Sequence, residues 1–222
     1  MKNLEVSFFF LFFIILSSCS NKSVDADISS AKVATFQITG LGCTSLQFGT
    51  GFFIDEGLIL TNAHVVAGVN APKLLSEGEE YFLDVVSFDA KSDLALLNSP
   101  GFKAKPLSFS EGYLGQDLKI IAYLESGVET VSEVVLKEKL LATGKDIFLR
   151  PGAVREVISL NGYIEAGFSG SPVINDSGDV VGVVFSRVRG GKPLAYAVQA
   201  SEVKNFLDSP RDVSEAGLCQ EK

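Results

Sequence analysis

Short apolar segments follow one another along most of this chain, and turn-forming residues separate them. The segments are rich in Val, Ile, Leu and Phe, and Gly, Asn, Asp, Ser and Pro stand between them. Many short segments of this kind at close spacing are typical of an all-β barrel or sandwich. The expected strands are 33–39, 51–54, 58–61, 81–88, 94–97, 118–123, 131–136, 147–149, 157–160, 172–174, 180–186 and 194–198.

These expected strands fall into two groups. A stretch rich in Gly, Pro, Lys and Ser, at 101–115, separates them. The chain has 222 residues, of which 46% are hydrophobic, so each group has enough apolar material for a core. We therefore expect two small barrels, at roughly 32–105 and 106–219. Only 201–207 predicts a helix, with Ser201 as its N-cap.

The first residues have the pattern of an export signal. The apolar run 6–16 is shorter than the roughly 20 residues that span a bilayer, and it matches the apolar region of a secretory signal. It leads into Leu-Ser-Ser-Cys at 16–19, which resembles a bacterial lipobox. We expect a lipoprotein signal peptide at 1–18 and a tether at 19–31, with diacylglycerol and palmitate on Cys19 holding the chain at the membrane outside the cytoplasm. An uncleaved signal anchor and ordinary signal cleavage are the alternatives.

Two further cysteines, Cys43 and Cys219, lie near the two ends of the expected mature chain. A disulfide between them would close a very long loop, which stabilises a fold by roughly 4–5 kcal/mol in the chain-entropy description. Such a bond persists outside the cytosol, in agreement with export. Two unpaired thiols are the alternative.

Composition argues against several classes of partner. The formal net charge is −8, and the sequence contains no cluster of Lys and Arg, so we expect no nucleic-acid binding. The chain has one His and no Cys-x-x-Cys, so we expect neither a zinc site nor any other metal site or cofactor.

Three segments contain residues suited to covalent catalysis. His64 follows Leu-Thr-Asn-Ala at the end of an expected strand, Asp93 directly precedes Leu-Ala-Leu-Leu, and Ser169 lies in Gly-Phe-Ser-Gly-Ser-Pro. A serine hydroxyl needs a base to become a nucleophile, and an imidazole titrates near neutral pH. A buried carboxylate can hold that imidazole in the required tautomer. Asp84 and Asp89 compete with Asp93 for this role.

The order His, Asp, Ser with these motifs resembles the chymotrypsin-like (trypsin-like, PA clan) serine proteases. Within that family the resemblance is to the bacterial HtrA/Deg proteases and, more strongly, to MarP-like periplasmic proteases, and it covers roughly 32–219. It implies two six-stranded antiparallel β-barrels with a short C-terminal helix. By the same resemblance His64 is the general base, Asp93 the orienting acid and Ser169 the nucleophile. The backbone amides of Gly167 and Ser169 would form the oxyanion hole.

The resemblance also assigns a substrate pocket and a disulfide. In MarP-like proteases a disulfide joins the two ends of the protease domain, which matches Cys43 and Cys219. A side chain such as Leu194 would narrow the pocket, so a small or medium apolar residue is expected before the scissile bond. Ordinary core packing is the alternative role for these residues. The expected pocket residues are Val184, Phe185, Ser186 and Leu194.

The sequence departs from the family pattern at two positions. Phe168 stands where digestive enzymes have the Asp that pairs with a newly formed N-terminus, so activation of that kind is not expected. Ser171 replaces a second glycine after the nucleophile.

The leading hypothesis is a lipid-anchored envelope serine endopeptidase that cleaves protein or peptide substrates. The alternative is a catalytically silent protease-like domain that binds envelope peptides or partner proteins. The oligomeric state stays open.

Overall fold

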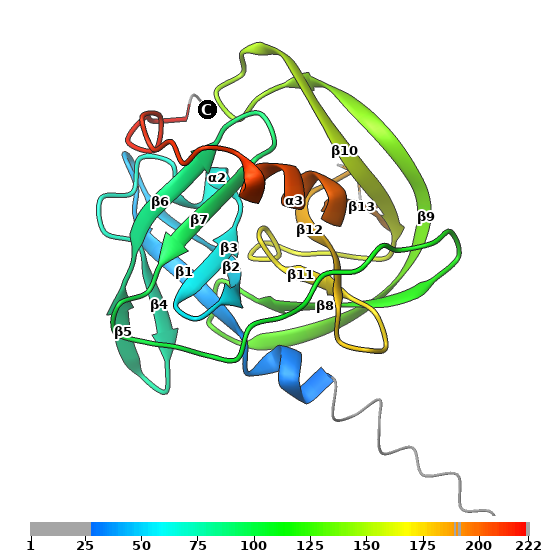
Figure 1. Ribbon diagram of the computed structural model, residues 1–222, viewed down its shortest axis with the longest axis horizontal. Coiled ribbons are helices and arrows are strands. Elements are labelled where there is room, and N and C mark those ends of the chain that lie inside the picture. The colour runs from blue at the N-terminus through cyan, green and yellow to red at the C-terminus, as the bar shows by residue number, and fades with distance from the viewer. Residues whose placement is uncertain (1–27, 189, 191, 221–222) are drawn as a thin grey trace, which may run out of the picture.

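The computed structural model describes residues 28–188, 190 and 192–220, which form two β-rich halves side by side (Figure 1). The predicted signal peptide, Cys19 and most of the predicted tether lie outside the described residues. The predicted fold class, all-β and of the chymotrypsin type with a short C-terminal helix, is confirmed. The elements are β1 (Thr35–Leu41), β2 (Leu46–Asp55), β3 (Leu58–Thr61), α2 (Ala63–Val66), β4 (Lys73–Ser76), β5 (Glu79–Phe82), β6 (Asp84–Asp89), β7 (Leu94–Asn98), β8 (Asp117–Tyr123), β9 (Glu129–Lys145), β10 (Pro151–Asn161), β11 (Pro172–Ile174), β12 (Val180–Arg187), β13 (Leu194–Gln199) and α3 (Ala200–Asp208).

The first half is a seven-stranded antiparallel sheet in the order β5-β4-β1-β2-β3-β7-β6, where a six-stranded barrel was predicted. Strand β4 was not predicted, and the predicted strand 81–88 is two strands, β5 and β6. They separate at Leu83, whose side chain is buried and whose N–H donates to the Pro72 carbonyl instead of continuing the ladder. Glu77 and Gly78, both at positive φ, make the turn that folds β5 back onto β4.

The second half is a closed barrel of six strands in the order β10-β13-β12-β11-β8-β9, as predicted. The predicted strand 147–149 is wrong, because these residues form the turn between β9 and β10. The Asp146 carboxylate accepts hydrogen bonds from the amides of Phe148 and Arg150, and this holds the three apolar residues in a turn.

Helix α3 extends one residue beyond the predicted 201–207 at each end. Its N-cap is Gln199, not Ser201, whose hydroxyl donates to the Glu156 carboxylate on β10. Val203 and Phe206 are buried on the face that packs against the second barrel, which is the amphipathic pattern that selects a helix here.

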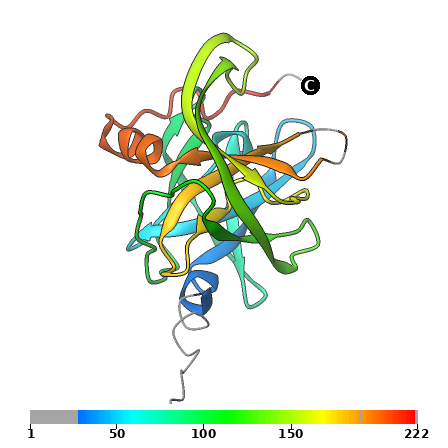
Figure 2. The ribbon, with the colours of Figure 1, turned by 90° about the vertical axis from the view of Figure 1, so that its right-hand side faces the viewer.

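A continuous core joins the two halves. Phe52, Leu60 and Leu94 of the first half belong to the same buried cluster as Val183 and Val198 of the second. Residues 28–32 form a short helix at one end of the molecule (Figure 2), and its Ala31 is fully buried in this cluster. The end of the predicted tether therefore overlaps the folded part. Burial of this shared cluster fixes the two halves against each other.

Among the described residues, no helix has both the length and the apolar character needed to cross a bilayer.

A disulfide joins Cys43, in the turn between β1 and β2, to Cys219 in the C-terminal segment, with 6.0 Å between their Cα atoms. Two hydrogen bonds reinforce this docking. The Gly68 amide donates to the Ala216 carbonyl at 2.8 Å, and Gln220 Nε2 donates to the His64 carbonyl at 2.7 Å. The disulfide thus attaches the end of the chain beside the only histidine in the sequence.

Reduction of this disulfide should lower the thermal midpoint of unfolding. The bond closes a loop of 176 residues, for which the chain-entropy description gives about 5 kcal/mol of stabilisation, or on the order of 10 °C for a domain of this size. Calorimetry with and without reductant measures the change. The double variant Cys43→Ser/Cys219→Ser is the control, because reductant should not change its midpoint. An oxidised chain that melts at the same temperature with and without reductant would contradict the stabilising role.

Candidate active site

His64 and Asp93 form a doubly hydrogen-bonded pair. His64 lies in α2, the single helical turn that follows β3, and its Nδ1 is 2.8 Å from Asp93 Oδ2 and 3.0 Å from Oδ1. The His64 backbone N–H also donates to Asp93 Oδ1 at 3.0 Å. One carboxylate therefore holds both the backbone and the ring of the histidine, and it sets the tautomer with the proton on Nδ1.

Asp93 reaches His64 because the turn before β7 takes an unusual backbone conformation. Its φ is +60°, which is uncommon for a residue other than glycine, and it is only 3% exposed. Asn62 Nδ2 donates to the Asp93 carbonyl at 2.8 Å and so couples this turn to α2. Of the competing residues, Asp89 instead accepts bonds from the Ser92 hydroxyl and amide inside the turn, and Asp84 is exposed at the start of β6.

The electrostatics of the pair favour a protonated imidazole. Burial of the ring lowers the pKa of His64, but the negative charge of Asp93 and its hydrogen bond to the ring outweigh this effect. The pKa of His64 therefore lies above its ordinary value of 6.5. Arg155, a third charged residue, opposes Asp93 and limits the rise in this pKa.

Ser169 lies in the turn between β10 and β11. This turn packs against β2 and against β3, the strand that precedes His64. The Ser169 carbonyl accepts a hydrogen bond from the Thr50 amide at 2.8 Å. At Gly170, where φ is +85°, an added Cβ would lie 2.0 Å from the Thr50 carbonyl oxygen and 2.4 Å from Thr61 Oγ1. Only glycine permits this approach, which packs the serine turn against β2 and β3.

No hydrogen bond joins the Ser169 hydroxyl to the His64 ring, although the structure describes both residues. Ser169 is half-buried and the His64 side chain is 27% exposed, so both are partly accessible to solvent. Catalytic hydrogen bonds are often long in the absence of substrate and tighten in the complex.

The backbone beside Ser169 leaves two donors free. The Gly167 carbonyl accepts a bond from Thr50 Oγ1 at 2.9 Å, and the same oxygen atom of Thr50 accepts one from the Tyr123 amide. Gly167 has φ of +101°, and a Cβ there would lie 2.1 Å from the Tyr123 carbonyl oxygen. In the described part of the chain, the amides of Gly167 and Ser169 donate no hydrogen bond. Two adjacent free donors suit an oxyanion.

Phe168 orders this loop by burial instead of by an ion pair. Its side chain is 1% exposed and packs in the core of the second barrel with Val184 and Ile164. The Ser171 amide donates to its carbonyl, which closes the turn around the serine. An apolar anchor is formed on folding and needs no cleavage of the chain.

The family follows from a comparison of the sequence with known families. Residues 49–183, which is more than half of the chain, match the model of the trypsin-like peptidase domain. The chain belongs to the trypsin-like peptidase family.

Relatives of this trypsin-like peptidase domain include bacterial serine proteases. Serine protease Rv3671c (MarP) of Mycobacterium tuberculosis is 33% identical over 168 residues, which are 74% of this chain and 42% of that protein. A probable periplasmic serine endoprotease, DegP-like, of Rhizobium meliloti is 31% identical over 170 residues, 72% of this chain and 32% of that protein. The predicted resemblance to HtrA/Deg and MarP-like proteases is confirmed. The chain spans less than half of the length of these relatives.

A solved structure has the same fold over nearly the whole chain. The crystal structure of the Rv3671c protease from M. tuberculosis in its active form superposes with a TM-score of 0.79 at 27% identity. The match covers 99% of this chain and 97% of that one.

Of the four residues predicted to line the substrate pocket, Val184 bonds directly to the serine turn. Val184 is fully buried, and its backbone exchanges hydrogen bonds with Gly170 and Ser171. Phe185 is partly buried and stacks near Tyr196, with 6.5 Å between ring centroids. Ser186 is exposed and Leu194 half-buried. Val184 is thus a core residue of the peptidase domain, and its neighbours Phe185 and Ser186 lie closer to solvent.

A cavity of about 740 Å³ lies beside His64. The disulfide forms part of its wall, with Phe48 and Gln220. Sequence reasoning did not identify Gln220 as part of the site. Its position directly after Cys219 was the available signal, because a Cys43–Cys219 bond places it beside β1 and β2. The lining residues are Cys43, Thr44, Ser45, Gln47, Phe48, His64, Val65, Cys219 and Gln220.

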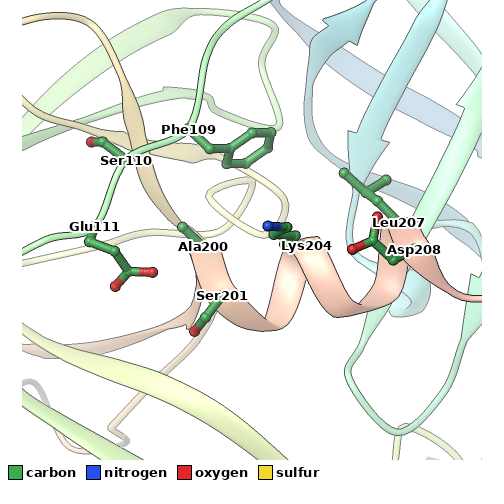
Figure 3. Close-up of a pocket in the computed structure, with 8 residues that line it drawn as sticks. All are labelled: Phe109, Ser110, Glu111, Ala200, Ser201, Lys204, Leu207 and Asp208. Carbon is green, nitrogen blue, oxygen red and sulfur yellow. The ribbon is translucent and has the colours of Figure 1, made fainter.

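A second cavity, of about 390 Å³, lies between the 109–111 segment and α3 (Figure 3). Phe109 and Leu207 give it an apolar wall, and Lys204 and Asp208 stand on the same helix. None of the predicted site residues lines it, so it is separate from the site formed by His64, Asp93 and Ser169.

Proposed function

We propose that the chain is a serine endopeptidase that hydrolyses peptide bonds through an acyl-enzyme. The observation that carries the proposal is the His64–Asp93 pair beside a serine turn with two free amides. A neutral imidazole fixed by a buried carboxylate is a general base, and two free backbone donors stabilise an oxyanion. Membership of the trypsin-like peptidase family supports the same reading.

In this proposal each group has one role. Ser169 Oγ attacks the carbonyl carbon of the scissile bond while His64 Nε2 takes the hydroxyl proton. The tetrahedral oxyanion accepts hydrogen bonds from the amides of Gly167 and Ser169. His64 then gives the proton to the leaving amine, and the C–N bond breaks. His64 takes a proton from a water molecule as the water attacks the ester carbonyl, and it returns this proton to Ser169 Oγ as the acyl C–O bond breaks. Asp93 stays ionised throughout.

In this proposal the substrate crosses the site in one direction. The segment before the scissile bond would run along β12, past Val184 and Phe185, with Ser186 and Leu194 bounding the primary pocket. The segment after the scissile bond would occupy the cavity beside His64 that the disulfide and Phe48 line.

We also propose that the peptidase acts at the cell envelope, attached through lipid on Cys19. The lipobox-like sequence at 16–19 supports this, as does the disulfide, which persists in an oxidising compartment. Mass spectrometry of the N-terminal peptide from membranes would detect the lipid, and an unmodified Cys19 would refute the anchor.

A fluorophosphonate probe tests the enzymatic proposal directly, because it reacts with a serine only where a base activates it. The folded chain should be labelled in a single position, and the heat-denatured chain should not be labelled. A folded chain that never reacts would instead favour a silent domain that binds peptides.

Activity should rise with pH through the titration of His64. The general base must be neutral, and the Asp93 charge raises the pKa of His64 above 6.5. Protonation therefore suppresses kcat/KM on the acid side, and half of the maximal value should be reached above pH 6.5. A pH profile of kcat/KM for one peptide measures this. An inflection clearly below pH 6.5 would contradict the dominance of Asp93 over burial and over Arg155.

A further inference from the structure

Arg155 is a buried cation in the second barrel. It lies on β10 and is only 8% exposed. Its guanidinium carbon is 5.2 Å from the centroid of the Phe185 ring, and its Nη2 donates to the Lys145 carbonyl at 3.2 Å. The guanidinium group therefore packs over the Phe185 ring, and the Lys145 carbonyl holds one edge of it.

The charge of Arg155 has no counter-ion in the described part of the chain. A guanidinium has five N–H donors, and only one of them has an acceptor here. Arg150, by contrast, pairs with both Asp146 and Glu215 although it is much more exposed. A buried charge without a partner is costly, and 27 acidic residues are available in the chain. The guanidinium of Arg155 therefore has donors available for an anionic ligand.

The position of Arg155 relates it to substrate. Phe185, on which it stacks, directly follows Val184, whose backbone bonds to the serine turn. The charge of Arg155 also reaches His64, since it lowers the pKa of the imidazole. Arg155 therefore contacts Phe185, beside which the residues before the scissile bond are proposed to bind. The cavity at the disulfide has neither Arg155 nor Phe185 among its lining residues.

We propose that Arg155 is a specificity-determining residue that binds an Asp or Glu side chain on the N-terminal side of the scissile bond. This inference rests on the proposed endopeptidase function and names the class of its substrates. A guanidinium pairs with a carboxylate through two parallel hydrogen bonds, and stacking on Phe185 holds it ready to do so. The carboxylate supplies the missing counter-charge, so an uncharged isostere leaves the guanidinium unpaired.

Matched peptides test the proposal on the unmodified protein. Each pair differs only by Glu or Gln at one position before the scissile bond, and kcat/KM is measured for both. The wild type should cleave the Glu peptide about 10-fold or more faster at one of these positions. In Arg155→Met, which retains the packing on Phe185, the Glu/Gln ratio should fall close to one. Arg211→Met, which removes a charge from an exposed segment, should retain the wild-type ratio.

The outcomes separate the inference from the enzymatic proposal. If the wild type cleaves peptides but distinguishes Glu from Gln at no position, the inference is wrong and the endopeptidase function stands. A wild-type ratio in Arg155→Met would assign the preference to another residue and equally overturn it. If Arg155→Met does not fold, Arg155→Lys replaces it, since it retains the charge without the paired donors. Its ratio should fall several-fold, and an unchanged ratio would refute the role of the guanidinium. A folded wild type that neither cleaves any peptide nor reacts with fluorophosphonate overturns both proposals.

Discussion

Replacing Ser169 with alanine should abolish fluorophosphonate labelling and lower kcat on peptides by about 10⁵–10⁶-fold. The reason is that Ser169 Oγ is the only nucleophile the proposed mechanism uses, and His64 cannot act without it. The fold should be unaffected, because the contacts that hold the turn are made by the Ser169 carbonyl with the Thr50 amide and by Gly170. Labelling followed by peptide mapping, and steady-state kinetics on a single peptide, measure the two effects.

Ser171→Ala is the matched control for this substitution. Ser171 lies two residues from the nucleophile, is fully buried, and its hydroxyl has no hydrogen-bond partner among the described residues. Its loss should leave labelling intact and change kcat by no more than a few-fold. If Ser169→Ala still reacted with the probe, or if Ser171→Ala abolished labelling, the nucleophile would be assigned to the wrong serine.

Replacing Asp93 with asparagine should lower kcat by about 10⁴-fold near neutral pH while the chain still folds. Asp93 Oδ1 accepts the backbone N–H of His64 at 3.0 Å, and the amide oxygen of asparagine can retain this bond. The asparagine NH₂ would then face His64 Nδ1, where it donates and does not accept. The imidazole must place its own proton on Nε2, so it can no longer take the proton of Ser169.

Asp89→Asn provides the comparison within the same turn. Asp89 accepts hydrogen bonds from Ser92 and from the Lys91 amide and makes none to His64. Its substitution should cost about 1 kcal/mol of stability and leave kcat within a few-fold. Circular dichroism and kinetics on both variants distinguish the roles. Activity in Asp93→Asn above about a tenth of the wild-type value would exclude Asp93 as the orienting acid.

Local patterns in the sequence were sufficient for the β class, the division into two halves and the second barrel. Strand β3 was predicted with its observed bounds because its apolar run ends sharply at Thr61 and Asn62. The strand predicted at 147–149 failed because three apolar residues in a row do not reveal that a preceding carboxylate will fold them into a turn. Strand β4 was missed because its four residues, Lys-Leu-Leu-Ser, are too short for a period of two to be visible.

The sequence by itself determined which residue types can perform the chemistry. These are a serine directly followed by a glycine, one histidine, an aspartate before an apolar strand, and two cysteines available for pairing. These signals are local, because catalysis and sharp turns demand particular residues at particular spacings. Only the tertiary structure decided which aspartate meets His64 and which amides beside Ser169 are left free. It also decided that Arg155 has no counter-ion among the residues that the structure describes. Those properties depend on how residues far apart in the chain pair and bury one another, and no neighbouring residue records that outcome.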